Sequence, residues 1–389
     1  MELHEFKAKQ LLSRYAIKSP AGRVAFSPED AESAASSLGP APVFVKAQIL
    51  AGDRAVAGGV ALAKTPADAR KIADGLLGTK LVTRQTGPNG LVIKRVLVEA
   101  AVQVAREFYL SMTVNALTGT LRITGGAGGT GVEEKAAKDR SAFATLDLNL
   151  KGEDKTGGFT DFCRHLAIPA EAVDKFCDVI SSIHRAFIEL DAGLIEINPL
   201  ALTDAGDFIA LDAKVSLDDN AMFRHADLAE LHETDEIDEV ELKAQRHQIN
   251  FVQMNGDIGV VVNGAGLGLA TLDLIHTAGG TPANFMDIRT TAKSLDIAQG
   301  IGLVLDNPRV KVLFVNVFGG GMQPCDTIIE GLGIAFRRKG RVVPVVLRVT
   351  GNNEDLAKIR LKSFGLPEIH GSDMWQAATH AVAIAQGKK

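Results

Sequence analysis

The sequence predicts an α/β protein with two domains, an α+β domain followed by a domain built on a parallel sheet. From residue 258 onward, patterns typical of a strand, a glycine-rich loop and a helix repeat in that order, which indicates a doubly wound parallel sheet. Before residue 228, the strand patterns include a hairpin turn at 204–207. The 389 residues exceed one ordinary domain, and 39 glycines are typical of an α/β protein with many tight turns.

Residues 1–227 mix helix and strand patterns. Residues 5–15 carry apolar side chains at roughly helical spacing. Two further helices are predicted to begin at Ser27-Pro28 and at Thr65-Pro66, with the hydroxyl residue as N-cap and Pro at the first helical position. The other elements expected in this region are strands at 43–46, 91–100 and 108–114, a glycine-rich loop at 125–131, a long helix at about 172–190, and strands at 193–198 and 208–214.

The acidic stretch 228–242 has a weaker apolar period than its neighbours, so we expect the domain boundary there, with domains 1–236 and 237–389. The repeats of the second domain are strands at 258–263, 312–317 and 343–349, each followed by a glycine or polar loop and by a helix at 269–277, 326–337 and 354–363. In doubly wound sheets, ligands bind at the carboxyl ends of the strands, where these loops lie.

Composition excludes several classes of protein. Aromatic residues are 5% of the chain, the formal net charge is −5 and there is no long basic run, so we expect no nucleic acid partner. No stretch approaches the roughly 18 apolar residues of a membrane helix, and because the N-terminus is charged and lacks an apolar core we expect neither a signal peptide nor a membrane anchor there. The three cysteines form no CxxC pair, which predicts reduced thiols and a cytoplasmic location.

The strongest local pattern is a set of oxygen-bearing side chains on two adjacent strands. Glu196 and Asn198 project to one face of the first strand, and Asp212 can lie opposite them on the second. Carboxylate and amide oxygens suit Mg²⁺, which takes few protein ligands, although the same pattern fits a polar strand edge that faces solvent. Lys46 follows a buried strand and precedes a glycine-containing loop, where a lysine can meet nucleotide phosphates.

Residues 263–268, Asn-Gly-Ala-Gly-Leu-Gly, resemble a dinucleotide fingerprint. A glycine loop before a helix binds many anions, however, and the acidic residue expected about 20 residues later is not clearly present, because 284–287 does not read as a second strand. An NAD-dependent dehydrogenase is therefore a weaker hypothesis. The nine histidines show no metal-binding spacing, so zinc is not expected.

Taken as a set, the motifs resemble the β subunits of succinate–CoA ligase (ADP-forming) and of malate–CoA ligase. The resemblance covers essentially the whole chain and includes residues 3–12, 45–48, 97–100, 107–110, 194–200, 220–224, 262–267, 316–320 and 350–353. It implies an ATP-grasp fold for 1–236 and a flavodoxin-like ligase domain for 237–389.

The resemblance also assigns roles to individual residues. It implies nucleotide contacts for Lys46, Asp53, Arg54, Ala55, Glu99, Val102 and Glu107. It implies Mg²⁺ ligands at Asn198 and Asp212, and a glutamate that steadies a phosphohistidine at Glu196. It implies an acid-substrate site at Asn263 and at Gly320, Gly321 and Met322. Arg289, which stands where the family has glycine, is predicted to help bind that acid, although it could instead pair with an acid such as Asp287 or contact the partner subunit.

The implied reaction uses ATP or GTP, Mg²⁺ and CoA. A histidine of a separate α subunit is phosphorylated, the phosphoryl group passes to a short organic acid (succinate, malate or a relative), and the CoA thiol attacks the acyl phosphate. The α subunit carries that histidine and the main CoA site, so an αβ heterodimer or heterotetramer is expected.

Four segments depart from the family pattern: residues 51–59, 125–131, 289–291 and 319–325. The first replaces GGRGK with Gly-Asp-Arg-Ala-Val, and the third replaces three glycines with Arg-Thr-Thr. The last is one residue longer than the family's substrate loop. We therefore expect an altered acid substrate, and a non-catalytic or regulatory ATP-grasp partner subunit is the alternative hypothesis.

Overall fold

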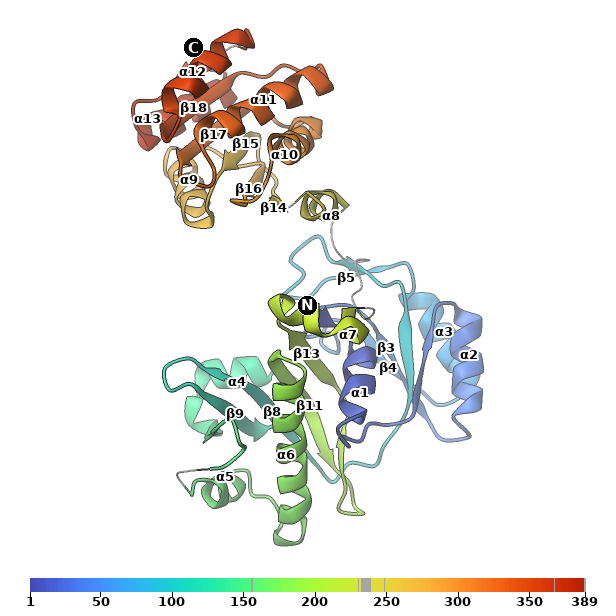
Figure 1. Cartoon of the computed structure of the whole chain (residues 1–389). Coiled ribbons are helices and arrows are strands. Elements are labelled where there is room, and N and C mark those ends of the chain that lie inside the picture. The colour runs from blue at the N-terminus through green and yellow to red at the C-terminus, as the bar shows by residue number, and fades with distance from the viewer. Residues whose placement is uncertain (155–156, 230, 232–238, 248, 367, 388–389) are drawn as a thin grey trace. The chain divides into compact units, whose positions relative to one another are not determined.

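The computed structural model describes the chain except for residues 155–156, 230, 232–238, 248, 367 and 388–389 (Figure 1). The chain divides into two compact units, Met1–Glu236 and Ile237–Lys389, and each has its own hydrophobic core. The predicted boundary between residues 236 and 237 lies outside the described residues.

One sheet of the first unit is antiparallel throughout and runs in the order β1-β13-β11-β8-β9-β10, with β12 also paired to β11. Its strands are β1 (Glu2–Leu3), β8 (Arg106–Asn115), β9 (Thr120–Ala127), β10 (Phe143–Leu148), β11 (Ala192–Leu202), β12 (Phe208–Ala210) and β13 (Ala213–Leu217). The long helix α6 (Val173–Glu189) packs on β8 and β11, because Phe176, Ile180, Ile183 and Phe187 repeat at helical spacing and are buried. The N-terminal helix α1 (Glu5–Ser13) packs on β13.

A second sheet of this unit has the order β2-β7-β3-β4, with strands β2 (Gly22–Ala25), β3 (Val43–Ala47), β4 (Val60–Ala63) and β7 (Val96–Ala100). Helices α2 (Pro28–Ser37) and α3 (Pro66–Leu76) pack against it and begin as the sequence predicts. The side chains of Ser27 and Thr65 accept from the amides of Asp30 and Asp68 at 3.0 and 3.1 Å. The remaining elements of the unit are β5 (Lys80–Leu81), β6 (Leu91–Val92), α4 (Val132–Lys138), η1 (Arg140–Ala142), α5 (Phe159–His165), η2 (Ala170–Ala172), η3 (Asp219–Arg224) and α7 (Ala226–Ala229).

Three element predictions for the first unit were wrong in detail. The strand predicted at 91–100 is split between β6 and β7, because the backbone of Ile93 pairs with Thr79 and that of Arg95 with Gln48. The strand predicted at 208–214 is interrupted at Leu211 and Asp212, between β12 and β13. The glycine-rich stretch is partly strand, since 125–127 belong to β9.

The second unit is a mostly parallel sheet in the order β14-β16-β15-β17-β18-β19. Its strands are β14 (Ile249–Gln253), β15 (Ile258–Val262), β16 (Asn284–Ile288), β17 (Val312–Gly319), β18 (Val345–Gly351) and β19 (Glu368–His370). From β15 onward this is the flavodoxin-like order, whose crossover point lies between β15 and β17. The sequence did not predict β14, which pairs antiparallel with β16 at the edge.

Helices cover both faces of this sheet (Figure 1). Val260 and Val262 pack with α9 (Ala265–Thr277) and α13 (Met374–Ala385), whereas Val261 packs in the core formed with α10 (Ser294–Asp306), α11 (Cys325–Lys339) and α12 (Glu354–Ser363). Strand β15 is therefore buried on both faces, as its unbroken apolar run indicates. The short helix α8 (Glu239–Gln245) precedes β14.

The interpretation of the 263–268 loop needs correction. Helix α9 begins at Ala265, four residues before the predicted start. Residues 284–288 do form the second strand, β16, although the sequence did not read as one. Asp287 Oδ1 accepts from the Gly264 amide at 2.5 Å and Oδ2 accepts from Asn250 at 3.1 Å, so both oxygens of this carboxylate are occupied by the chain itself.

Candidate functional site

A cavity of about 1170 Å³ lies in the first unit between its two larger sheets. Ten residues that the sequence singled out, separated by up to 166 positions, all line it. They are Lys46, Asp53, Arg54, Ala55, Glu99, Val102, Glu107, Glu196, Asn198 and Asp212. Ligand pockets in proteins commonly span about 300–1,000 Å³, so this cavity has room for a nucleotide.

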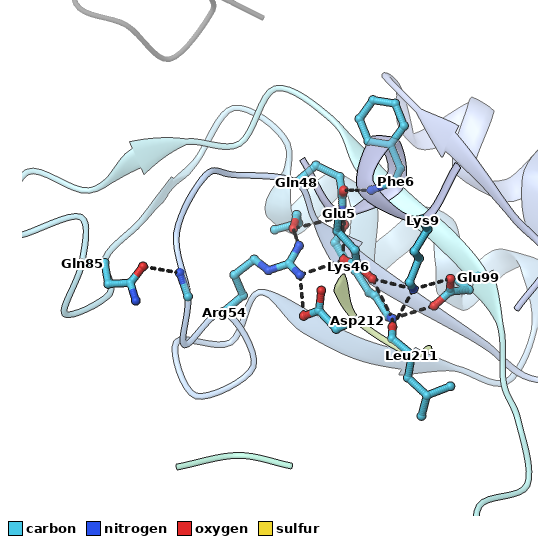
Figure 2. A network of polar contacts seen from close by, with 12 residues as sticks. Glu5, Phe6, Lys9, Lys46, Gln48, Arg54, Gln85, Glu99, Leu211 and Asp212 are labelled. Atoms are coloured by element: carbon cyan, nitrogen blue, oxygen red, sulfur yellow. Dashed lines mark hydrogen bonds and ion pairs between the residues drawn. The ribbon is translucent and has the colours of Figure 1, made fainter. Parts of the chain in front are cut away.

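Lys46 lies near the end of β3 and its ammonium is surrounded by oxygen atoms (Figure 2). It donates to Glu99 Oε2 at 2.6 Å, to the Leu211 carbonyl at 2.6 Å and to Glu5 Oε1 at 3.0 Å. The Leu211 carbonyl is available because the chain is not paired in a strand at that position, between β12 and β13. The interruption that the sequence did not predict thus helps to build the site.

Lys9, on α1, makes a parallel set of bonds. Its ammonium donates to Glu5 Oε1 at 2.8 Å, to Glu99 Oε1 at 2.6 Å and to the same Leu211 carbonyl. Glu5 and Lys9 were not predicted as site residues from the sequence. The signal was present, because these two charged residues share the stripe of α1 that buries Ala8 and Leu12, and buried charges need partners.

Arg54 joins this network from the loop after β3. Its Nη2 lies 2.8 Å from Glu5 Oε2 and 2.7 Å from Asp212 Oδ2, and its Nη1 donates to the Ala47 carbonyl at 2.8 Å (Figure 2). Gln48 donates to Glu5 Oε2 at 3.1 Å, so the Glu5 carboxylate accepts bonds from Lys9, Lys46, Arg54 and Gln48 together.

Six charged groups therefore form one network, which we call the charge cluster: Glu5, Lys9, Lys46, Arg54, Glu99 and Asp212. Its three cations balance its three carboxylates. All of its side chains are at most 10% exposed except that of Asp212, which is 39% exposed. The cluster is thus a neutral, largely desolvated group that opens to the cavity at Asp212.

Burial and charge act against each other in this cluster. Burial raises the pKa of the Glu5 carboxyl, but Lys46, Lys9 and Arg54 together hold it well below its ordinary value. Burial lowers the pKa of Lys46, but Glu5, Glu99 and Asp212 raise it above its ordinary value. Burial raises the pKa of Glu99, since Lys46 and Lys9 offset it incompletely and Glu5 adds repulsion. Lys46 and Arg54 therefore remain charged at neutral pH.

Residues 51–59, the expected phosphate loop, which departs from the family pattern, are also held in place. Asp53 adopts the left-handed conformation with φ +60°, which glycine tolerates best. Its carboxylate pairs with Arg84 at 2.8 Å, and the Gly52 amide donates to Gln85 at 2.8 Å. The acid is therefore neutralised by a residue outside the cavity lining, and the side chain of Val56, which replaces the lysine of the family pattern, is exposed.

Two oxygen-bearing residues fit a divalent cation. Asn198 and Asp212 are adjacent through a backbone bond of 3.2 Å from the Asn198 amide to the Asp212 carbonyl. Asn198 Oδ1 accepts from the Gly129 amide at 2.9 Å and retains a second lone pair. No group of three or more His, Cys, Asp or Glu that could hold a metal occurs in the described part of the chain. A carboxylate and an amide that leave the remaining positions to phosphate and water suit Mg²⁺.

The glycine-rich stretch approaches this side of the cavity closely. A Cβ atom on Gly128 would lie 2.6 Å from the carbonyl atoms of Phe108, so glycine is required where the loop crosses β8. Glu196, opposite Lys214 on β13, accepts from the Tyr109 hydroxyl at 3.2 Å. Tyr109 is a second partner that the sequence did not reveal.

The expected acid-site residues lie in the second unit, at the carboxyl ends of β15 and β17. The Asn263 amide group bonds both backbone groups of Phe318, donating to its carbonyl at 2.7 Å and accepting from its amide at 2.8 Å. It thereby ties the two strands together at the crossover point. Gly320 and Gly321 have open space beside their Cα atoms, and Met322 is 72% exposed.

Arg289 is directed away from this crossover point. Its guanidinium donates to Asn250 Oδ1 at 3.0 and 3.2 Å, and Asn250 in turn donates to Asp287 at 3.1 Å. Asn250 lies on β14, whereas Asn263 follows β15, on the other side of β16. Reaching Asn263 would require Arg289 to leave Asn250.

Comparison with known proteins agrees with this architecture. Residues 2–202 match the ATP-grasp domain family, and residues 261–385 match the CoA-ligase family. A structure of ATP citrate lyase from Methanothrix soehngenii superimposes over 100% of this chain and 99% of its own, with a TM-score of 0.77 at 18% identity, and so shares the fold. An ATP-grasp domain followed by a CoA-ligase domain is thus the class of protein that the fold and the site define.

Full-length relatives narrow this class. The succinate–CoA ligase [ADP-forming] subunit beta of Desulfosudis oleivorans is 41% identical, with 98% of each chain covered. The corresponding subunits of Persephonella marina and Ralstonia pickettii are each 39% identical, with at least 99% of each chain covered. The chain therefore belongs to the family of succinate–CoA ligase (ADP-forming) β subunits. Among its described helices, none is long and apolar enough to cross a membrane.

Proposed function

We propose that this chain is the nucleotide-binding β subunit of an ADP-forming acid–CoA ligase, which converts a short organic acid, CoA and ATP to acyl-CoA, ADP and phosphate. The observation that carries this proposal is the convergence of ten sequence-predicted residues on one cavity. The names of its relatives support the same reaction class.

In this proposal, Lys46 and Arg54 bind the nucleotide phosphates, and Glu99, Val102 and Glu107 contact the nucleoside. Both cations are held by buried carboxylates before any ligand arrives, so little reorganisation is needed when negative charge develops on the transferring phosphoryl group. Mg²⁺ bound by Asn198 and Asp212 would neutralise phosphate charge and orient the triphosphate.

The γ-phosphoryl group passes to a ring nitrogen of a histidine that an α-type subunit supplies, and ADP leaves. Glu196, oriented by its bond from Tyr109, accepts a hydrogen bond from that histidine and holds its ring in line. The acid carboxylate then takes the phosphoryl group, and the CoA sulfur attacks the acyl carbon and displaces phosphate. We expect the assembly to be an αβ heterodimer or a heterotetramer, located in the cytoplasm, where the free thiols of Cys163, Cys177 and Cys325 are stable.

For the acid, we propose a site formed by Asn263, Gly320, Gly321 and Met322, to which Arg289 contributes. Arginine adds a permanent charge and a fork of donors where the family has glycine, which favours an acid with an additional anionic or hydroxyl group. The supporting observation is that, among the described residues, the guanidinium donates to the amide oxygen of Asn250, a neutral partner that a carboxylate can replace.

The alternative is a non-catalytic or regulatory partner subunit, motivated by the altered phosphate loop. Two observations favour the catalytic subunit: Asp53 is paired with Arg84, and Arg54 still faces the cavity. Calorimetry of the isolated chain with ATP and Mg²⁺ tests the nucleotide site. Co-expression with an α-type subunit and assay against a panel of short acids tests the reaction. Acyl-CoA formation by the pair is expected; nucleotide binding without any turnover would support the regulatory alternative, and turnover by the single chain would refute the need for a partner.

A further inference from the structure

Arg54 forms an ion pair with the Asp212 carboxylate, which a bound metal would need as a ligand. Its Nη2 lies 2.7 Å from Asp212 Oδ2, and the same nitrogen lies 2.8 Å from Glu5 Oε2 (Figure 2). The partners of this guanidinium differ in exposure: the Glu5 side chain is 1% exposed and the Asp212 side chain 39%. Glu5 and the Ala47 carbonyl therefore anchor Arg54 in the interior, while Asp212 is the partner that solvent and ligands can reach.

We propose that Arg54 is a resident counter-ion for Asp212, so that a divalent cation binds this carboxylate strongly only together with the nucleotide phosphates. This inference rests on the metal role of Asp212 in the proposed function. It adds an order of binding: the metal enters as a complex with the nucleotide, and free metal binds only weakly.

The charge balance of the cluster gives the physical reason. Glu5, Glu99 and Asp212 already neutralise Lys9, Lys46 and Arg54. A divalent cation that arrived alone would add uncompensated positive charge to a poorly solvated group and would compete with a guanidinium in contact with the same carboxylate. A nucleotide polyphosphate carries more negative charge than one divalent cation carries positive charge, so the complex of the two meets no such penalty.

The anchoring of Arg54 determines what happens after the exchange. When Asp212 turns to the metal, Arg54 keeps its bonds to Glu5 and to the Ala47 carbonyl, so it remains at the cavity wall. The Nη2 donor that Asp212 has released then becomes available to a phosphate oxygen. The ion pair between Arg54 and Asp212 is thus exchanged for two new pairs, and no charge of the cluster is left without a partner.

Metal binding without nucleotide tests this inference directly. The whole chain is titrated with Mn²⁺ alone, and free Mn²⁺ is followed by electron paramagnetic resonance. Wild type is expected to bind weakly, and Arg54→Gln to bind Mn²⁺ at least about tenfold more tightly, in keeping with the coupling of close charge pairs. Arg140→Gln is the matched control, since Arg140 is an exposed residue that lines the same cavity and its loss removes the same charge. Its Mn²⁺ affinity should rise less than about threefold.

A second variant protects the test against misfolding. Glu5→Gln combined with Arg54→Gln removes one charge of each sign, so the cluster stays neutral, and a gain in Mn²⁺ affinity is expected from the loss of the competing guanidinium alone. If neither variant binds Mn²⁺ more tightly than Arg140→Gln does, Arg54 is not the counter-ion and the inference is overturned. The Asp212→Asn variant tests whether such a failure lies in this inference alone or in the metal site of the proposed function. If it binds Mn²⁺ in the presence of ATP as tightly as wild type does, the metal site of the proposed function is itself wrong.

Discussion

Replacing Lys9 or Lys46 by Met should destabilise the chain to a similar extent, but Lys46→Met alone should weaken nucleotide binding strongly. The two ammonium groups share Glu5, Glu99 and the Leu211 carbonyl as acceptors. Among the described residues that line the cavity, Lys46 is present and Lys9 is not. Comparing the two variants therefore separates the contribution of a buried lysine to stability from its contribution to nucleotide binding.

The magnitude follows from the contacts. Removing one partner of a buried ion pair costs about 3–5 kcal/mol, and the lower end applies because the remaining lysine still bonds both carboxylates. A loss of about 3 kcal/mol lowers the unfolding temperature by roughly 6–12 °C for a unit of this size. A hydrogen bond between charged groups contributes about 1.5–3 kcal/mol, so Lys46→Met should lose a further ten- to hundredfold or so in ATP affinity.

The assay is thermal unfolding without ligand, followed by calorimetric titration with ATP and Mg²⁺ at a temperature where both variants are folded. Lys9→Met should keep its ATP affinity within about threefold of wild type, since its ammonium does not reach the ligand. Equal losses of ATP affinity in the two variants would refute the separation of roles. Unfolding temperatures unchanged from wild type would refute the buried charge cluster.

Four further outcomes are expected. Asp212→Ala should abolish nucleotide-dependent phosphorylation of the α-type partner while circular dichroism shows a folded chain, since Asp212 is the most exposed member of the cluster; phosphorylation at the wild-type rate would exclude the metal role. Gly128→Ala should lower the unfolding free energy by about 1–3 kcal/mol in denaturant titration, because its Cβ would lie 2.6 Å from Phe108 backbone atoms; no change would mean that the loop shifts freely. Burial raises the pKa of Glu5, but Lys46, Lys9 and Arg54 hold that pKa well below its ordinary value of 4.5. The ionised Glu5 carboxylate therefore contributes fully to stability above pH 4.5, and this contribution is lost as the pH falls through the lowered pKa. Glu5→Gln should flatten the acid limb of a plot of unfolding temperature against pH, and an unaltered limb would contradict this. Arg289→Gly should reduce kcat/KM for the preferred acid at least about tenfold, roughly 1.4 kcal/mol, and reduce it less for succinate; equal losses would place Arg289 outside acid recognition, and succinate as the best substrate of the wild-type pair would reject the altered-acid proposal.

The sequence predicted the elements with strong periodicity or capping signals. Helix α6 was predicted because Phe176, Ile180, Ile183 and Phe187 recur on one face, and α2 and α3 because a hydroxyl residue precedes proline. It failed where long-range pairing decides the local conformation. The apolar runs at 91–100 and 208–214 look continuous, yet each is cut by backbone bonds to segments far away in the chain.

In the candidate site, too, residues in local motifs were predicted, whereas residues defined by long-range contacts were not. Residues with a recognisable motif, such as Lys46, Asn198 and Asp212, were found and line one cavity. Glu5 and Lys9 were missed although they share the buried stripe of α1, because Glu99 and the Leu211 carbonyl, which complete their network, come from other elements. Tyr109 was missed because its partner Glu196 lies on another strand. The direction of Arg289, toward Asn250, depends on the edge strand β14, which the sequence did not predict.

The acceptor shared by Lys9 and Lys46 is a main-chain carbonyl, that of Leu211, and this has a consequence for redesign. A peptide oxygen persists through any side-chain replacement, so position 211 can be varied widely while the two lysines keep a common acceptor. Scanning mutagenesis would therefore score this position as tolerant, although its oxygen is part of the binding apparatus. Replacing the amide linkage after Leu211 by an ester, which weakens that oxygen as an acceptor without altering any side chain, would expose its contribution.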